Sequence, residues 1–203
     1  MSDTGHVHAG PLAVAEAPPR PRVQVVPLRG LPVVAAAVVF VVVAIAGNWL
    51  WALTFSHVVG GGLWTAIDLF VGLIIGPIMG RLPAAARVEF AARFMPKMVL
   101  IMPTLVMMTL AAGFQLALLE GNLAPSNANH GWLVVSYCVV GVMAVIALGG
   151  LEPANIAVLV EMRKARPDGE IIARLMKRFV FTAGLTGVMQ VATLIIMTRV
   201  ATQ

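Results

Sequence analysis

Apolar runs about as long as a bilayer crossing recur along this chain, and they limit its possible folds more than any other feature. A helix needs about 20 apolar residues to cross the ~30 Å hydrocarbon core of a membrane. Hydrophobic residues make up 60% of the sequence and charged residues 11%, against about 25% charged residues in soluble domains. The sequence therefore predicts an all-α integral membrane helix bundle with five transmembrane helices, at about residues 31–53, 57–80, 98–119, 132–151 and 178–198.

The segments outside these runs divide the chain into two parts. Residues 1–30 are rich in proline and have no helical period, which predicts a cytoplasmic Pro-rich tail ahead of a transmembrane domain at 31–203. Because the apolar stretch that begins the domain is too long for one crossing, we expect a tight turn between Trp51 and Gly62. Residues 83–97 have a polar and an apolar side and predict an amphipathic helix at the membrane surface.

The basic residues set the predicted orientation. With five crossings, thirteen of the 14 Lys and Arg residues fall on one side of the membrane, and only Arg199 falls on the other. Positive residues gather on the cytoplasmic side of membrane proteins, so we expect the N-terminus in and the C-terminus out. The net charge of +5 then reflects topology rather than a nucleic-acid partner. We expect a multi-pass protein of the bacterial cytoplasmic (inner) membrane, surrounded by the lipid bilayer.

The second span carries most of the polar and small residues found inside an apolar run. Read as one helix, it places six residues on one face at steps of three or four: His57, Gly61, Trp64, Asp68, Gly72 and Gly76. The opposite face is apolar and suits lipid: Val58, Val59, Leu63, Ile67, Phe70, Val71 and Ile74. We expect this span to form the inner wall of the bundle.

Asp68 is the only acidic residue in the middle of a span, about 16 Å along the helix from His57. An ionisable group at that depth is costly unless it is protonated or paired, and it commonly marks a functional site. The structural alternative is a neutral acid hydrogen-bonded to a neighbouring helix. The candidate partners are Gln115, Ser136, Tyr137 and Gln190.

Two histidines lie outside the tail and are expected at the outer ends of spans. His57 has the chemistry of an axial heme ligand or a copper ligand, and Gly61 and Gly72 would let a flat ring approach the backbone. Both histidines also have a plain interpretation as interfacial residues, which is stronger for His130 in its polar loop. Gly72, Gly76 and Gly80 likewise form a run typical of close helix packing.

Sulfur-bearing residues allow a second metal hypothesis. Soft thioethers bind Cu(I), and methionines gather in the third span, although flexible core packing is their more frequent use: Met95, Met98, Met102, Met107 and Met108. The single cysteine, Cys138, excludes a disulfide framework, and we expect it to be buried. The chain has no phosphate-binding loop, no Ser/His/Asp set and no paired carboxylates, which argues against hydrolysis and phosphoryl transfer.

Several short motifs resemble those of the HemJ-type protoporphyrinogen oxidases and their CopD-like relatives. They are His57 followed by Trp64, the stretch FMPKMVLIMPTLVMMTLAAG at 94–113, and Trp132-Leu133 at the start of span four. The resemblance covers about residues 52–200 as a four-helix core, to which the first span and the tail would be additions.

The resemblance implies b heme as cofactor, because that family associates a helix-borne histidine and a lysine with heme b. His57 matches the histidine. The place of the lysine falls at Ser136 or a neighbour, and span four has no lysine, which argues against protoporphyrinogen oxidation itself. The second axial position would then fall to a methionine, to His130 or to no residue.

These observations lead to one functional prediction with two alternatives. We expect a b-heme-binding membrane protein in electron transfer or tetrapyrrole redox chemistry, with quinone or another redox membrane protein as partner. His57 would be the axial ligand, Trp64 and the glycines would line the ring, and Asp68 would be a proton or propionate-side group. The alternatives are copper handling through His57 and His130, and a non-catalytic transmembrane subunit. For each of these functions we expect the chain to belong to an oligomer or a larger complex.

Overall fold

The computed structural model describes residues 27–164 and 166–202, and every secondary-structure element within them is a helix. Residues 1–26, and with them most of the predicted tail, lie outside the described residues. The elements in chain order are η1 (Leu28–Gly30), α1 (Leu31–Ala46), α2 (Leu50–Phe70), η2 (Val71–Ile75), α3 (Gly76–Arg81), α4 (Ala84–Leu119), α5 (His130–Ile146), η3 (Ala147–Leu151), α6 (Glu152–Met162) and α7 (Gly169–Ala201).

Five continuous helical stretches of the described chain are long and apolar enough to cross a membrane, which confirms the predicted helix bundle. They are Leu28–Ala46, Leu50–Arg81, Ala84–Leu119, His130–Met162 and Gly169–Ala201. Each of the last four is longer than the span predicted for it. The segment at 83–97, expected at the membrane surface, continues one of these helices, Ala84–Leu119, instead of forming a separate element.

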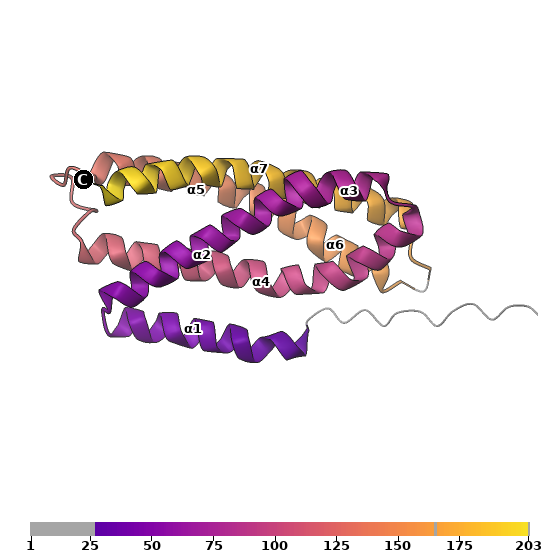
Figure 1. The fold of residues 1–203 in the computed structure, drawn as a ribbon, viewed down its shortest axis with the longest axis horizontal. Helices are drawn as coiled ribbons and strands as arrows, with labels where there is room; N and C mark the ends of the chain where they lie inside the picture. Colours follow the sequence, from indigo (N-terminus) through magenta and orange to yellow (C-terminus); the bar gives the residue numbers. More distant parts are fainter. Residues whose placement is uncertain (1–26, 165, 203) are drawn as a thin grey trace, which may run out of the picture.

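The two ends of the bundle differ in charge. The α1–α2 turn, the loop 120–129 and the C-terminus lie at the left end in Figure 1, and the α3–α4 and α6–α7 connections lie at the right end. We call the right end the basic end, because it carries every described Lys and Arg except Arg199: Arg29, Arg81, Arg87, Arg93, Lys97, Arg163, Lys164, Arg166, Arg174, Lys177 and Arg178.

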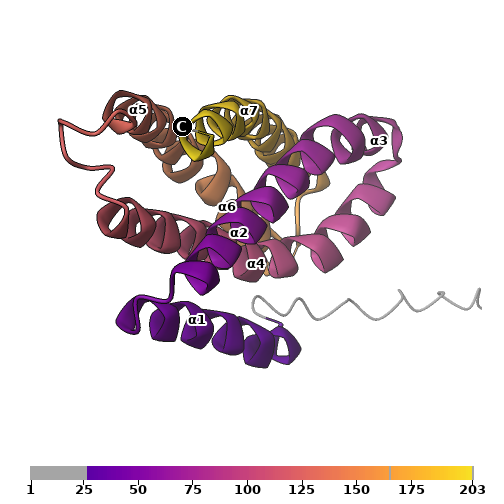
Figure 2. The ribbon, with the colours of Figure 1, turned by 60° about the vertical axis from the view of Figure 1, so that its left-hand side comes forward.

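Helix α7 is the centre of the bundle, and α1 lies at its edge. α7 packs against α2, α4, α5 and α6, whereas α1 packs against α2 and α4 (Figures 1 and 2). Glycines allow the closest of these contacts: Gly72 meets Gly184 backbone to backbone, and Gly187 faces the backbone of Leu69. The predicted use of glycine for close helix packing is confirmed at Gly72. The arrangement also fits a four-helix core with one added span.

The first turn comes earlier than predicted, at residues 47–49 rather than between Trp51 and Gly62. Asn48 adopts a left-handed backbone conformation, with φ 51°, which asparagine tolerates better than most residues. Its Oδ1 accepts a hydrogen bond of 2.7 Å from Nε2 of Gln115 on α4, so the turn is fixed to the bundle. Trp51, which falls within the predicted first span at 31–53, belongs to the first turn of α2.

Helix α4 is continuous where the sequence predicted a surface helix at 83–97 followed by a separate span. It runs from Ala84 to Leu119 through Pro96 and Pro103. Prolines are tolerated in membrane helices because neighbouring groups can satisfy the freed carbonyls. The helix has no break at the boundary predicted near residue 97.

The π-helical segments η2 and η3 each precede a proline, Pro77 and Pro153. A proline has no N–H for the carbonyl four residues before it, and π-helical turns relieve the resulting clash. For Pro153 that carbonyl belongs to Gly149, and it accepts a hydrogen bond of 2.7 Å from the Arg178 guanidinium on α7.

Two side chains face in directions that the sequence did not predict. Val71, expected to face lipid, is 2% exposed and belongs to the main core, because it follows Asp68 by three residues and Trp64 by seven and so continues the buried face of α2. Cys138, expected to be buried, is exposed on α5. The buried face of α5 instead contains Leu133, Ser136 and Met143.

Candidate functional site

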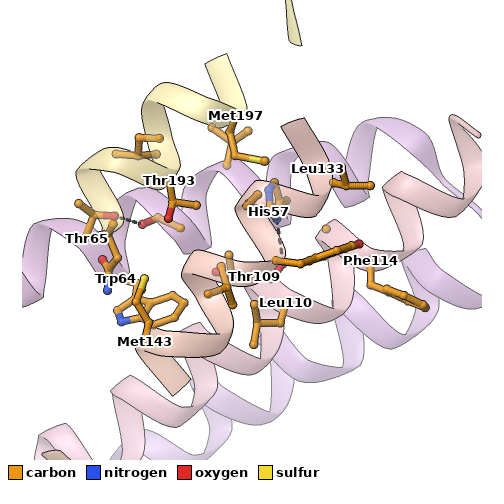
Figure 3. A pocket seen from close by; sticks show the side chains of 18 of the residues that line it. His57, Trp64, Thr65, Thr109, Leu110, Phe114, Leu133, Met143, Thr193 and Met197 are labelled. Carbon is orange, nitrogen blue, oxygen red and sulfur yellow. Dashed lines mark hydrogen bonds between the residues drawn. The ribbon is translucent and has the colours of Figure 1, made fainter. Parts of the chain in front are cut away.

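A pocket of about 310 Å³ lies between α2, α4, α5 and α7, in the half of the bundle away from the basic end (Figure 3). Its walls come from residues 57–65, 109–114, 133–143 and 190–201. Helices α4 and α5 do not pack closely against each other, and the pocket separates them. Phe114, Tyr137 and Leu194 in its walls are 40–52% exposed and belong to membrane-crossing helices, so the pocket opens sideways toward lipid.

His57 stands in the wall of this pocket with a fixed orientation (Figure 3). Its Nδ1 lies 2.8 Å from the backbone carbonyl oxygen of Thr109 on α4. A carbonyl only accepts, so Nδ1 carries the proton and donates it to that oxygen. The other ring nitrogen, Nε2, then keeps a lone pair. A backbone carbonyl that fixes the imidazole in this way is a recurrent support for metal-binding histidines.

Gly113 makes the room that the imidazole occupies. A Cβ at this position would lie 2.5 Å from Cε1 and Nδ1 of His57, well inside van der Waals contact. The ring therefore packs directly on the backbone of α4. One turn of α4 thus provides both the carbonyl that holds His57 and the glycine that admits it.

Asp68 lies behind the pocket and joins α2 to α7. Three donors converge on its Oδ2: Nε1 of Trp64 at 3.0 Å, Oγ1 of Thr186 at 3.0 Å and Nε2 of Gln190 at 2.8 Å. All three are electrically neutral, and Asp68 itself is 2% exposed. Because Trp64 and Gln190 also line the pocket, Asp68 holds two of its walls in place. Of the partners considered from the sequence, Gln190 is confirmed.

One polar atom at the deep end of the pocket has no hydrogen-bond partner. Gln190 is 4% exposed, and its Oε1 is buried without a donor among the described residues. The hydroxyls of Ser136, Tyr137 and Thr193 belong to other parts of the lining. The pocket is therefore mainly apolar, with a few polar groups. Small-molecule sites commonly combine these features.

The structure separates the predicted site residues into three places. His57, Gly61 and Trp64 line the pocket together, whereas Asp68 supports it from behind. Gly72 lies outside it and packs on α7. His57 is about 10 Å inside α2 instead of at its end, because α2 begins at Leu50.

The groups considered for copper do not gather around His57. His130 begins α5 and does not line the pocket, and its Nδ1 is buried without a partner in the part of the chain that the structure describes. Met95, Met98 and Met102 are buried in the main core. Within residues 27–164 and 166–202, no group of three or more His, Cys, Asp or Glu side chains is placed to hold a metal ion.

Sequence reasoning missed several residues of the site. Thr109 and Gly113 hold His57, and Met143 and Met197 bring thioethers to the pocket walls. Nothing in the sequence links them to His57, because they are distant along the chain. Thr186 was also missed, although its spacing of four residues from Gln190 on α7 was a usable signal.

Comparison with protein-family models, curated proteins and solved structures gives no match for this chain. The resemblance to HemJ-type and CopD-like proteins thus stays a prediction from short motifs.

Proposed function

We propose that this chain is a b-heme-binding membrane protein that acts in electron transfer or tetrapyrrole redox chemistry, with Nε2 of His57 as the axial ligand. The observation that carries the proposal is the 2.8 Å hydrogen bond from His57 Nδ1–H to the Thr109 carbonyl. It fixes the tautomer and the ring plane, and it leaves the ligating nitrogen available in the wall of a largely apolar pocket.

The donor set and the wall residues of the pocket support this cofactor. Histidine and methionine are the usual axial ligands of electron-transfer hemes, and Met143 and Met197 both line the pocket with His57. Gly61 has no side chain to obstruct a ring, and Trp64 offers an aromatic wall. A heme bound here would supply one-electron redox chemistry. The protein's part is to ligate through His57, to keep the ring in an apolar surrounding and to fix the wall through Asp68.

The position of the pocket also suits a partner that travels in the membrane. Its side opening lies between α4 and α5, among exposed apolar side chains such as Phe114 and Leu110. A quinone or another redox membrane protein would therefore approach the site from the bilayer. In the proposed orientation, with the basic end in the cytoplasm of a bacterium, the site lies in the outer half of the cytoplasmic membrane.

The test is a visible spectrum of the detergent-purified protein, oxidised and then reduced with dithionite, after expression with added hemin. We expect a b-type spectrum from the unmodified chain and its loss in His57→Ala. The matched control is His130→Ala, which removes the same side chain outside the pocket and should leave the spectrum intact. Met143→Leu and Met197→Leu then identify the second axial ligand, since loss of a thioether ligand shifts the spectrum and the midpoint potential.

Two results would refute the proposal. A colourless unmodified protein would exclude heme binding, and an unchanged spectrum in His57→Ala would exclude His57 as ligand. The copper hypothesis receives no support from the third-span methionines, because Met95, Met98 and Met102 pack in the main core and none of the five lines the His57 pocket. A structural-subunit role predicts no spectrum together with fixed partners in a mild-detergent pull-down.

A further inference from the structure

A second hollow, separate from the His57 pocket, lies near the basic end between α7 and the η2–α3 segment. Its volume is about 700 Å³. On one side it is lined by Gly72, Gly76 and Gly80, and on the other by residues 173–188 of α7. We call this hollow the glycine groove. The proposed heme function makes no use of it.

Three glycines alternate with Leu73, Pro77 and Met79 along one wall of the groove. Gly72 rests on Gly184, which forms its floor, and a Cβ on Gly76 would lie 2.5 Å from Cγ1 of Val180. At Gly80 an added Cβ would meet no atom within 4 Å, so this position faces open space. The other wall is apolar and largely exposed, with Phe181 at 70%.

The length of the groove matches one leaflet of a membrane. Its wall on α7 extends from Ala173 to Val188, about 22 Å at 1.5 Å per residue, and the part from the cation Lys177 to Val188 is about 16 Å long. Half of the ~30 Å hydrocarbon core is about 15 Å. An extended acyl chain of one leaflet therefore fits along the groove, from the basic end to near the middle of the bundle.

Two cations stand at the basic end of this groove, and no acidic residue lines it among the described residues. They are Arg87 from α4 and Lys177 from α7. The ion pairs found in the described chain join other residues: Arg93 with Glu89, and Lys164 with Glu161. The Nε of Arg87 is buried and has no hydrogen-bond partner among the described groups. A buried guanidinium nitrogen without an acceptor is costly.

We propose that the glycine groove binds one anionic phospholipid, with its acyl chain against the glycines and its phosphate between Arg87 and Lys177. A phosphate oxygen would accept hydrogen bonds from the guanidinium of Arg87 and the ammonium of Lys177, since both groups suit phosphate. Basic pockets between membrane helices on the cytoplasmic side bind anionic headgroups. The proposed orientation places the groove in that leaflet.

The experiment measures thermal stabilisation of the detergent-purified full chain by added lipid. Phosphatidylglycerol and phosphatidylcholine with identical acyl chains are titrated separately, and inorganic phosphate forms a third arm. We expect saturable stabilisation by phosphatidylglycerol and much weaker stabilisation by the other two. Arg87→Gln and Lys177→Gln should each raise the apparent Kd for phosphatidylglycerol about fivefold, since a basic residue near an anionic surface contributes about 1 kcal/mol.

The matched control is Arg174→Gln, which removes a positive charge from an exposed position of the same helix outside the groove. It should leave the Kd unchanged. Gly80→Leu tests the shape, because it introduces a side chain where the groove is open, and it should weaken binding. Lys177 is exposed, so its variant keeps the test valid if Arg87→Gln does not fold.

Three outcomes would overturn the proposal. Equal stabilisation by the two lipids would show that charge plays no part. An effect of Arg174→Gln as large as that of Lys177→Gln would indicate a diffuse surface attraction. Stabilisation by phosphate alone would show a simple anion site in place of a lipid site.

Discussion

Replacing Gly113 by alanine tests the contact that fixes His57, with or without a bound cofactor. In the unmodified chain the new methyl group would lie 2.5 Å from two ring atoms, so the imidazole must move and its bond to Thr109 breaks. The lost hydrogen bond costs about 1 kcal/mol, and overpacking adds about 1 kcal/mol or more. Alanine has a better helix propensity than glycine, which stabilises the variant by about 1 kcal/mol. The net change is a destabilisation of about 1 kcal/mol.

Gly113→Ala should stabilise the protein, instead of destabilising it, when the imidazole is absent. In a His57→Ala background the methyl group meets open space, so only the propensity gain of about 1 kcal/mol remains. The two backgrounds therefore differ by about 2 kcal/mol, which a double-mutant cycle measures as a coupling energy. The free energies come from reversible SDS titrations followed by circular dichroism, on protein made without added hemin.

Gly141→Ala is the control for this cycle. It is also a glycine-to-alanine change inside a helix, but its Cβ would meet nothing within 4 Å. It should stabilise both backgrounds equally. A coupling between His57 and Gly113 below about 0.5 kcal/mol, the range of independent sites, would refute the packing described here and remove the main support for a fixed imidazole.

Two further substitutions test the contacts between α2 and α7. Asp68→Leu should lower the free energy of unfolding by several kcal/mol, and by much more than Asp68→Asn does. The leucine leaves Nε1 of Trp64 and the other donors buried without an acceptor, at about 1–3 kcal/mol each. Comparable losses in the two variants, measured by SDS titration, would contradict this role of Asp68. Gly187→Ala places a Cβ 2.9 Å from the backbone nitrogen of Leu69. We therefore expect it to lower the free energy of unfolding by about 1–3 kcal/mol, whereas Gly141→Ala should stabilise the protein. Equal effects of the two alanines would show that α7 does not need this close approach.

The sequence determined the class of the fold and the number of crossings. Apolar runs of this length leave no alternative to helices in lipid, since each backbone N–H and C=O must be paired inside its own segment. The spacing of the residues from His57 to Asp68 also placed the polar face of α2 correctly, because a helix repeats every 3.6 residues. The length of the apolar runs was sufficient for the first conclusion, and the helical period was sufficient for the second.

Boundaries were predicted less well, because they depend on single residues and their partners. The turn at Asn48 depends on a left-handed backbone and on Gln115 from another helix. The continuity of α4 through Pro96 and Pro103 depends on neighbours that accommodate the prolines. Apolar composition alone does not reveal these structural features.

The site itself was decided by tertiary structure. The sequence offered His57, Asp68 and a set of glycines, but it could not show that Thr109 and Gly113 would fix the imidazole or that Gln190 would reach the carboxylate. Those contacts join residues separated by about 50 to 120 positions. Their formation depends on how α2 crosses α4 and α7, and that crossing is set by the fit of small residues against facing backbones rather than by the period of any one helix.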